Sequence, residues 1–304
     1  MTGLRPCLPG TTRGIYVVSK GKKARKKARK NFEEVEHKIF NMIFHSLFEY
    51  SYLWLPLIGF VIGFCASVIG GGGGFFFLPV LILFYQVPAQ VAVATSLAAT
   101  IPVCMAGTFS HYRQNNIDKK IGLIFIITGV VGALIGAYLT SIISSDHLKI
   151  AFGIYCVILA FQMFLNILKN KDKVRKTTED MSSRYKTSRG SSYGFLAGII
   201  TGTFGTSGTA PVLAGLFSLN MPLKVIAGTS IVVVSVNTVS ALGAHFMVGR
   251  IDLTLVYFLT IGTFLGALIG PQKMAKVKLE SAEGHARFWF AVIMVIFGVV
   301  MIFS

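Results

Sequence analysis

Two glycine-rich segments inside apolar stretches are the parts of this sequence best suited to chemistry. The first is the five-glycine run at residues 70–74, and the second, Gly205-Thr206-Ser207-Gly208, also brings two hydroxyls. Glycine interrupts a helix and frees backbone groups. Where a short helix restarts after the break, its N-terminus presents unpaired N–H groups and a partial positive charge, which favour an anion. We therefore predict an anion site between the breaks, the alternative being that the glycines only allow close helix packing.

Hydroxyl side chains inside the apolar spans extend this candidate site. Thr-Ser pairs occur at matched positions in the two halves of the chain. Hydroxyls in a span also bond a carbonyl one turn earlier or a neighbouring helix, but recurrence in both halves favours a role in binding. The predicted substrate-binding residues are Gly72, Gly73, Gly74, Thr95, Ser96, Gly205, Thr206, Ser207, Gly208, Thr229 and Ser230.

Three further polar residues are candidates for coupling or gating. His111 and His245 end two matched spans, where histidine can relay protons or simply lie at the membrane interface. Asn237 lies inside a span and could instead bond another helix. No Ser-His-Asp set, metal cluster or paired intramembrane carboxylates occur in the sequence. We therefore expect no enzyme activity, no catalytic residue, no metal and no cofactor.

The composition predicts an all-α polytopic membrane protein. Hydrophobic residues make up 53%, charged residues only 13%, and the mean hydropathy is +0.68. Several apolar stretches reach the roughly 20 residues that a helix needs to cross a bilayer, and no alternation typical of a barrel is present. We expect four to five hydrophobic segments in each half, at residues 53–69, 75–85, 90–109, 121–143 and 148–168, then 193–204, 210–219, 223–247, 253–269 and 288–303.

The net charge of +17 lies mainly outside these spans, in a tail around residues 20–30 and a linker around residues 169–189. Basic flanks of this kind are typical of cytoplasmic segments that attract anionic lipid, whereas nucleic-acid binding lacks an aromatic platform here. We predict a basic tail and interfacial helix over residues 1–50, a first repeat over 51–168, a charged linker over 169–191 and a second repeat over 192–304.

The two halves match when one is shifted by the 134 positions that separate Ser96 from Ser230. The same shift places His111 on His245 and Asp118 on Asp252, and the run at residues 132–136 is identical to that at 266–270. Internal repeats are common in secondary transporters. The matched G-x-x-x-G runs predict close-packing faces, and the two aspartates predict helix caps.

Two topologies satisfy this pattern. If each broken span crosses once, each half has four crossings, the repeats are parallel, and the tail and linker are both cytoplasmic. If each short piece forms its own arm, each half has an odd number of crossings. The repeats are then inverted, and one basic segment lies outside.

The motifs resemble those of the TauE/SafE family, the sulfite exporter or toluene-sulfonate uptake permease family. The resemblance lies in the segment from Gly63 to Pro79, in Ala92-Val-Ala-Thr-Ser96, and in their counterparts Gly202 to Pro211 and Ala227-Gly-Thr-Ser230. It covers residues from about Leu57 to the C-terminus, although the second glycine motif departs from the family's usual Gly-Gly-Gly run. The resemblance implies transport of small sulfur-containing or organic anions such as sulfite or sulfonates.

We therefore expect a secondary transporter of a small anion that works by alternating access, in the plasma (inner) membrane of a bacterium with the basic tail in the cytoplasm. A passive anion channel and a non-transporting membrane scaffold are the alternatives. The expected partners are the anion and the bilayer, with anionic headgroups at the tail and linker and no nucleic acid. The sequence is also compatible with a homodimer.

Overall fold

The computed structural model describes residues 43–46, 49–69, 73–169, 182–246, 250–274 and 279–303. The chain divides into two units, Met1–Ile43 and Phe44–Ser304, and the second contains nearly all of the described residues. The predicted tail, most of the predicted interfacial helix, Gly72 and the centre of the linker lie outside the described residues.

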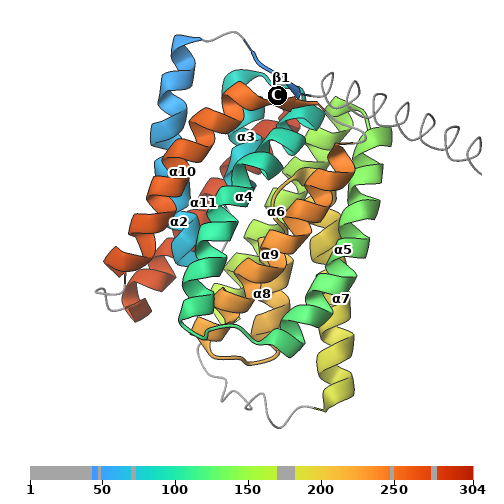
Figure 1. Ribbon diagram of the computed structural model, residues 1–304, viewed down its shortest axis with the longest axis vertical. Coiled ribbons are helices and arrows are strands. Elements are labelled where there is room, and N and C mark those ends of the chain that lie inside the picture. The colour runs from blue at the N-terminus through green and yellow to red at the C-terminus, as the bar shows by residue number, and fades with distance from the viewer. Residues whose placement is uncertain are drawn as a thin grey trace, which may run out of the picture. The chain divides into compact units, whose positions relative to one another are not determined.

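Helices make up almost all of the second unit, as the composition predicts (Figure 1). The first half contains a 3-10 turn η1 (Tyr50–Trp54), followed by α2 (Leu55–Ile69), α3 (Gly74–Tyr85), α4 (Ala89–Arg113), α5 (Lys119–Ile142) and α6 (Ser145–Lys169). The second half contains α7 (Ser183–Phe204), α8 (Thr209–Ser218), α9 (Leu223–His245), α10 (Leu253–Met274) and α11 (Leu279–Phe303). Two-residue strands occur at β1 (Ile43–Phe44) and β2 (Ile251–Asp252).

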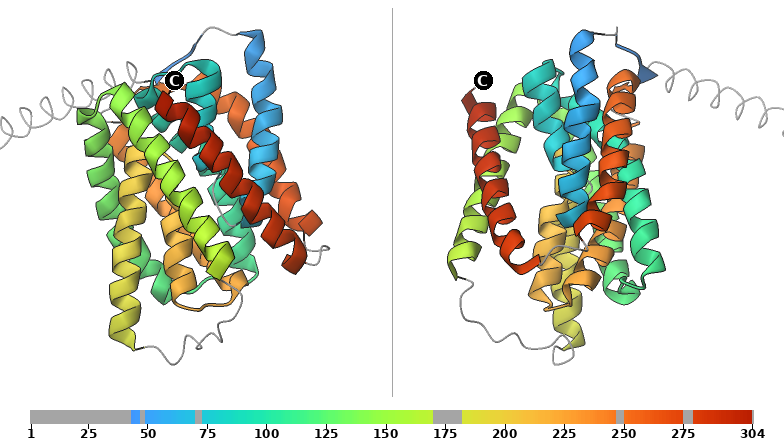
Figure 2. Two further views of the ribbon diagram at one scale, coloured as in Figure 1. Left: turned by 180° about the vertical axis from the view of Figure 1, so that it is seen from behind. Right: turned by 90° about the vertical axis from the view of Figure 1, so that its left-hand side faces the viewer.

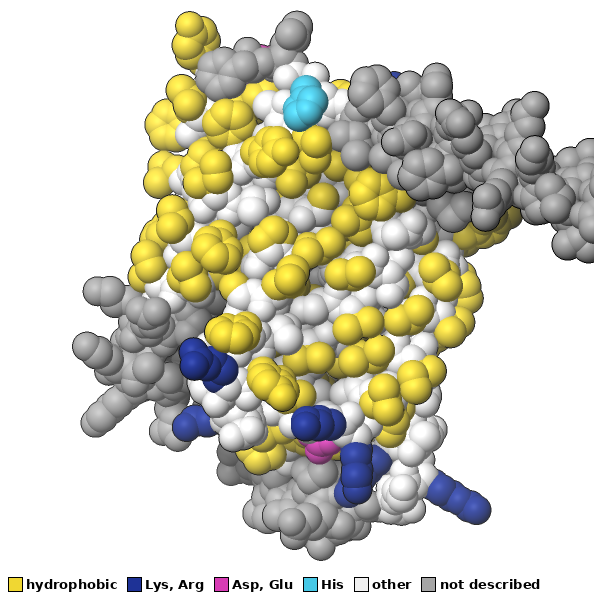
Figure 3. Space-filling model, viewed as in Figure 1, with side chains coloured by type: hydrophobic (Ala, Val, Ile, Leu, Met, Phe, Trp, Pro, Cys, Tyr) yellow, Lys and Arg dark blue, Asp and Glu magenta, His cyan; other side chains and the backbone are white. Residues whose placement is uncertain are grey.

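Four of the described helices are long and apolar enough to cross a membrane by length and composition. They are Ala89–Arg113, Lys119–Ile142, Ser145–Leu165 and Lys224–His245. Apolar side chains such as Leu123, Ile127 and Val131 are half or more exposed on the outside of α5. Figure 3 shows apolar side chains spread over the face toward the viewer and basic ones gathered at its lower end. An apolar outer surface of this extent suits lipid rather than water.

The two helices on either side of each glycine break run antiparallel to each other. The Tyr85 hydroxyl at the end of α3 donates to the carbonyl of Ser51, 3.0 Å away, and the Tyr85 ring lies 5.6 Å from that of Tyr52. The chain therefore returns to the end where α2 begins. In the second half, a methyl group on Gly215 of α8 would lie 2.6 Å from Cβ of Tyr193 in α7. These contacts exclude the topology in which each broken span crosses once.

The two halves run in opposite directions. In Figure 1, α4 runs from the upper to the lower end of the bundle, whereas α9 runs from the lower to the upper end. Three long helices follow each hairpin, so each half would have an odd number of crossings if each of these helices spans the membrane. This is the arrangement expected of inverted repeats, although the repeat itself stays a prediction from the sequence register.

The first helix of each half packs closely against a helix of the other half, at positions where that helix has glycine. A methyl group on Gly136 of α5 would lie 2.8 Å from the backbone nitrogen of Thr203 in α7. A methyl group on Gly266 of α10 would lie 2.7 Å from the backbone nitrogen of Phe64 in α2. Small residues let helix backbones approach this closely in membranes. The predicted close-packing role is confirmed for these two residues, and Gly132 and Gly262 make equivalent contacts.

Aspartate side chains cap the starts of the long helices α5 and α10. The Asp118 carboxylate accepts hydrogen bonds of 3.0 Å from the backbone N–H groups of Lys120 and Ile121, which confirms it as the cap of α5. Asp252 accepts a bond of the same length from the Thr254 backbone N–H at the start of α10. Helix α7 begins at Ser183, earlier than the apolar span at residue 193, so its first turns are built from polar residues of the predicted linker.

The last helix of each half, α6 and α11, lie side by side (Figure 2). A methyl group on Gly153 of α6 would lie 2.8 Å from the carbonyl oxygen of Gly298 in α11. The buried apolar core runs inward from this pair through Phe152 of α6 to Phe77 and Leu81 of α3 and Leu97 of α4. Gly73 and Gly74 at the start of α3, and residues 205–208 after α7, are buried inside the bundle, where lipid cannot reach their backbone groups.

Candidate functional site

The two glycine turns meet inside the bundle. A methyl group on Gly74, the first residue of α3, would lie 3.0 Å from the carbonyl oxygen of Gly205 and 3.5 Å from the backbone nitrogen of Ser207. Gly74, Gly205 and Ser207 are all buried. The structure thus brings together the breaks that the sequence predicts as two halves of one site.

Left-handed backbone shapes both turns. Gly73, before α3, has φ of 75°, and Gly205 and Gly208 have φ of 66° and 58°. Ser207 has φ of 59°, which is uncommon for a residue with a side chain and costs free energy. Gln86, Asn115 and Asn220 share this backbone, but among these four non-glycine residues only Ser207 lies in a glycine break.

Helix α4 lines the turns with two hydroxyls. Ser96 Oγ lies 2.8 Å from the carbonyl oxygen of Val93 and 3.0 Å from that of Gly205, to which its hydroxyl can donate. The Thr100 hydroxyl donates to the carbonyl of Ser96 at 2.7 Å. A methyl group on Gly74 would lie 2.7 Å from Thr100 Oγ1. Ser96 therefore lies where the sequence predicts it.

Thr100 belongs to the site but is not among the residues predicted from the sequence. Its position four residues after Ser96 on a helix was the available signal, since residues four apart share a face. Comparing the two halves does not reveal Thr100, because the matched position in the second half is the apolar Val234.

Two fully buried hydroxyls at predicted site residues have no hydrogen-bond partner. They belong to Thr206, in the second turn, and to Ser230 of α9. The Ser207 hydroxyl, by contrast, lies 3.1 Å from that of Thr209. Leaving a buried hydroxyl unsatisfied costs about 1–3 kcal/mol. Each such group in a native structure needs an explanation, and a ligand absent from this structure is one.

The helices that restart after the turns add backbone donors. Gly73 and Gly208 precede α3 and α8, and neither helix has a side-chain cap at its N-terminus. Free N–H groups there carry partial positive charge. Among the described residues, the buried acidic, basic or histidine side chains are Asp252 and His245. Asp252 accepts from the Ser46 and Thr254 backbone N–H groups, and His245 Nε2 lies beside the carbonyl oxygen of Gly202, three residues before Gly205. The electrostatics of the turns therefore favour an anion.

The hydroxyls of Thr95 and Thr229 each bond to a backbone N–H group in the other half of the chain. Thr95 Oγ1 accepts a hydrogen bond of 3.2 Å from the Asp252 backbone N–H, and Thr229 Oγ1 accepts one of 2.9 Å from that of Asp118. Successive helix residues point about 100° apart, so each threonine faces a neighbouring helix start while the serine beside it faces inward. The structure thus separates the members of each Thr-Ser pair.

The three gating candidates occupy different surroundings. His245 is buried, and its Nε2 lies 2.7 Å from the carbonyl oxygen of Gly202 in α7. His111 is partly exposed, and its Nδ1 is buried without a partner. Asn237 is fully buried, neither of its amide atoms has a partner, and its Nδ2 would lie 2.6 Å from a methyl group on Gly129 of α5. Gly202 lies three residues before Gly205, so His245 contacts the last turn of α7, which leads into the second glycine turn.

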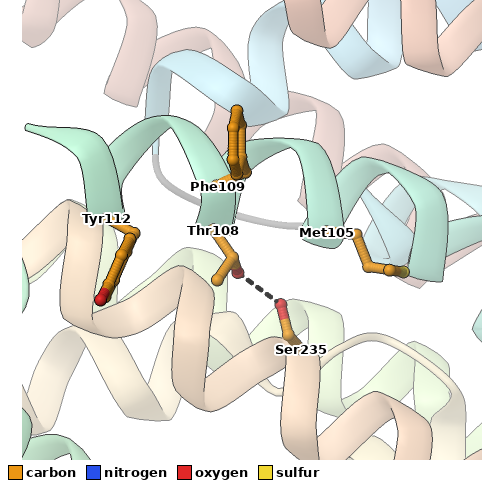
Figure 4. Close-up of a pocket in the computed structure, with 5 residues that line it drawn as sticks. All are labelled: Met105, Thr108, Phe109, Tyr112 and Ser235. Atoms are coloured by element: carbon orange, nitrogen blue, oxygen red, sulfur yellow. Dashed lines mark hydrogen bonds between the residues drawn. The ribbon is translucent and has the colours of Figure 1, made fainter.

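A surface hollow of about 280 Å³ lies between α4 and α9, away from this site (Figure 4). Thr108 and Ser235 face each other across it, with their hydroxyl oxygens 2.9 Å apart. Its lining residues are Met105, Thr108, Phe109, Tyr112 and Ser235, and none of them is a predicted site residue. Met105, Phe109 and Tyr112 are largely exposed on the outside of the bundle, so the hollow opens on its apolar surface.

Comparison with known proteins gives one consistent result. The family profile described as "Sulfite exporter TauE/SafE" matches residues 55–301. The probable membrane transporter protein YdhB of Bacillus subtilis is 34% identical over 232 residues, which cover 74% of this chain and 93% of that protein. The probable membrane transporter protein YunE of the same organism is 26% identical over 249 residues, or 76% of this chain and 91% of that protein.

A third relative comes from an archaeon. The probable membrane transporter protein MJ0441 of Methanocaldococcus jannaschii is 25% identical over 263 residues, which cover 82% of this chain and 94% of that protein. The matched region includes both glycine turns and the helices around them. The chain therefore belongs to the TauE/SafE family and is a multi-pass membrane protein of a transporter family, not an enzyme.

Proposed function

We propose that this protein is a secondary transporter that moves a small sulfur-containing or organic anion, such as sulfite or a sulfonate, by alternating access. The observation that carries this proposal is the meeting of the two glycine turns, where a methyl group on Gly74 would lie 3.0 Å from the carbonyl oxygen of Gly205. Two helix N-termini without side-chain caps begin at the turns, the Thr206 hydroxyl in the second turn is buried and unpartnered, and so is the Ser230 hydroxyl on α9.

These groups are donors, and an oxyanion is an acceptor. Backbone N–H groups at a helix N-terminus and serine or threonine hydroxyls can each donate to an anionic oxygen. Among the described residues no carboxylate hydrogen-bonds to the turns, so a cation would lack a charged partner there, whereas an anion could accept a hydrogen bond from the unpartnered Thr206 hydroxyl. The donor set therefore supports an oxyanion substrate over a metal ion or an amine.

Alternating access is supported by the opposite direction of the halves. A site at the meeting point of two inverted halves can face either side when one half rocks against the other. The passive channel remains the competing function, since it would use the same site. Counterflow separates the two: a transporter accelerates labelled anion uptake when unlabelled anion is present inside the vesicle, and a channel does not.

For orientation, we propose that the linker end faces the cytoplasm of a bacterial plasma membrane. The exposed basic residues Arg113, Lys119, Lys120 and Lys224 lie in the short loops and helix starts of this end. Short basic loops dominate the positive-inside rule. The chain enters the described bundle at the opposite end, where the Ser46 backbone N–H donates to Asp252 at 3.3 Å.

This orientation conflicts with a cytoplasmic basic tail, because residues 1–42 contain no apolar stretch long enough to cross a bilayer. Only one of the two basic segments can then be cytoplasmic. Reporter fusions at residue 117 and before residue 44 would decide. Cytoplasmic activity of the first fusion and external activity of the second support the proposal, and the reverse pattern would restore the cytoplasmic tail.

The experiment that tests the function is a thermal-stability screen of the purified protein against sulfite, sulfate, thiosulfate, taurine, sulfoacetate, phosphate, acetate and chloride. A ligand at 100 times its Kd stabilises the folded state by about 2.7 kcal/mol, which gives a measurable rise in Tm. We expect a selective rise with a sulfur oxyanion or organic anion. No rise with any member of the panel at millimolar concentration would overturn the proposed substrate class.

Substitutions of the unpartnered hydroxyls test whether the rise in Tm with the anion depends on the candidate site. Thr206→Val and Ser230→Ala remove hydroxyls that bond nothing in the folded protein, so both should keep the Tm of the free protein and weaken the response to the anion. Ser218→Ala is the matched control, since this hydroxyl donates to the carbonyl of Gly215 at 2.6 Å near the end of α8. It should lower stability slightly and leave anion affinity unchanged.

A further inference from the structure

A tyrosine on α6 lies against both glycine turns. The ring of Tyr155 stacks on that of Phe204 at 5.5 Å and 16°, and it lies 5.9 Å from that of Phe75. Phe204 is the residue before Gly205, and Phe75 is the residue after Gly74. Tyr155 therefore contacts one flank of each turn, which places it within a side-chain length of the point where the turns meet.

The aromatic rings around Tyr155 form one cluster. Phe152, one turn earlier on α6, lies 5.6 Å from Phe75 and 5.5 Å from Phe204. The cluster thus fastens α6 to the first residues of α3 and the last of α7. Ring contacts of this kind contribute about 0.5–1.5 kcal/mol each beyond their buried area, and phenylalanine at residue 155 would make them as well as tyrosine does.

The hydroxyl of Tyr155 has no role in that packing. Its oxygen is buried and has no hydrogen-bond partner. A buried tyrosine hydroxyl usually finds a partner, because leaving it unsatisfied destabilises the folded state. Among the described residues, the second turn itself contains the buried, unpartnered hydroxyl of Thr206, and Tyr155, whose ring contacts Phe204 beside that turn, contains another.

We propose that the Tyr155 hydroxyl donates a hydrogen bond to the transported anion, so that α6 completes the site formed by the two turns. A phenol is a neutral donor, which suits an oxyanion that must be released after each transport step. Because α6 carries this hydroxyl, the position of α6 also depends on whether the site holds an anion. This inference rests on the proposed function and adds to it a specificity-determining residue that none of the sequence motifs contains.

The test compares Tyr155→Phe with the wild type in the anion screen, using the anion that gives the largest rise in Tm and titrating it to obtain Kd. Tyr155→Phe keeps the ring and removes only the hydroxyl. We expect an equal or higher Tm without anion, because an unsatisfied buried group is lost. We also expect Kd to rise about five- to tenfold, as for one lost hydrogen bond.

Tyr85→Phe is the matched control. The Tyr85 hydroxyl donates to the Ser51 carbonyl at 3.0 Å at the other end of α3, so its loss should lower Tm and leave Kd unchanged. The outcomes separate the two proposals. An anion response in the wild type that Tyr155→Phe retains with the same Kd overturns the role of Tyr155 alone. No response in the wild type counts against the proposed function itself.

Discussion

Thr95 Oγ1, near the start of α4, accepts a hydrogen bond of 3.2 Å from the backbone N–H of Asp252, which caps α10 in the other half of the chain. The reciprocal contact exists too, since Thr229 Oγ1 of α9 accepts a bond of 2.9 Å from the Asp118 backbone N–H. The first contact lies at the end of the bundle where the chain enters and the second at the linker end. These paired bonds therefore join the halves above and below the glycine turns.

Thr95→Val and Thr229→Val should each lower stability without removing the anion response. Each change leaves a backbone N–H without its acceptor, which costs about 0.5–1.5 kcal/mol when the group stays accessible to water and more when it does not. Thermal unfolding of the free protein measures the loss, and titration with the anion measures Kd. If either valine variant keeps full stability and loses the response, the hydroxyl contacts substrate after all.

Gly205→Ala should destabilise the protein strongly. A methyl group there would lie 2.5 Å from Ser96 Oγ and 2.6 Å from the carbonyl oxygen of Val93, and the φ of 66° disfavours any residue with a Cβ. The conformational cost alone is about 1–2 kcal/mol, to which the contacts add. Gly243→Ala in α9 is the control, because nothing lies within 4 Å of the added methyl group. It should be neutral or stabilise by up to about 1 kcal/mol. Equal Tm values for both variants would contradict this account of the turn.

Gly129→Ala should be rescued by a change at Asn237. The added methyl group would lie 2.6 Å from Asn237 Nδ2, and the fully buried asparagine has little room to move. Asn237→Ala removes the clash, so the double variant should be more stable than Gly129→Ala alone. Contacting residues show coupling energies of about 0.5–3 kcal/mol in such cycles. Additive effects on Tm would mean that the two side-chain positions do not meet.

His245→Phe should cost more stability than His111→Phe. His245 Nε2 lies 2.7 Å from the Gly202 carbonyl oxygen, inside the contact between α7 and α9. His111 occupies the matched position, but its Nδ1 has no partner. Removing a side chain that makes a hydrogen bond destabilises the folded state by about 0.5–1.5 kcal/mol, whereas removing one that makes none does not have this cost. Melting curves of the two variants test this, and a larger loss for His111→Phe would reverse the assignment.

The sequence predicts the helices well because apolar length decides where a span can lie. The stretch predicted at residues 75–85 is α3 (Gly74–Tyr85), and that predicted at 121–143 is α5 (Lys119–Ile142). The start of α7 was missed, since polar residues can be helical outside the apolar span and leave no periodic apolar signal. Hydropathy marks the part of a helix that can face hydrocarbon, not its end.

The candidate site was predictable in part. Glycine runs identified the breaks because few other residues tolerate left-handed backbone. The structure places the Ser96 hydroxyl against Gly205 and leaves that of Thr206 buried without a partner, while their role in binding stays a prediction. Tyr155 was not predictable, since nothing in the chain near it distinguishes it from an ordinary aromatic residue of a span. Its distances to Phe75 and Phe204 come from three segments far apart in the sequence.

The sequence by itself determined the class of protein, the helical segments and the positions of the two breaks, because these depend on local hydropathy and on the backbone freedom of glycine. Only the tertiary structure decided that each break reverses the chain and that Thr95 and Ser96 have different roles. A glycine turn permits both a continued and a reversed path, and the contact between Tyr85 and Ser51 selects the second. Adjacent helix residues point in different directions, so what each one meets depends on helices elsewhere in the chain.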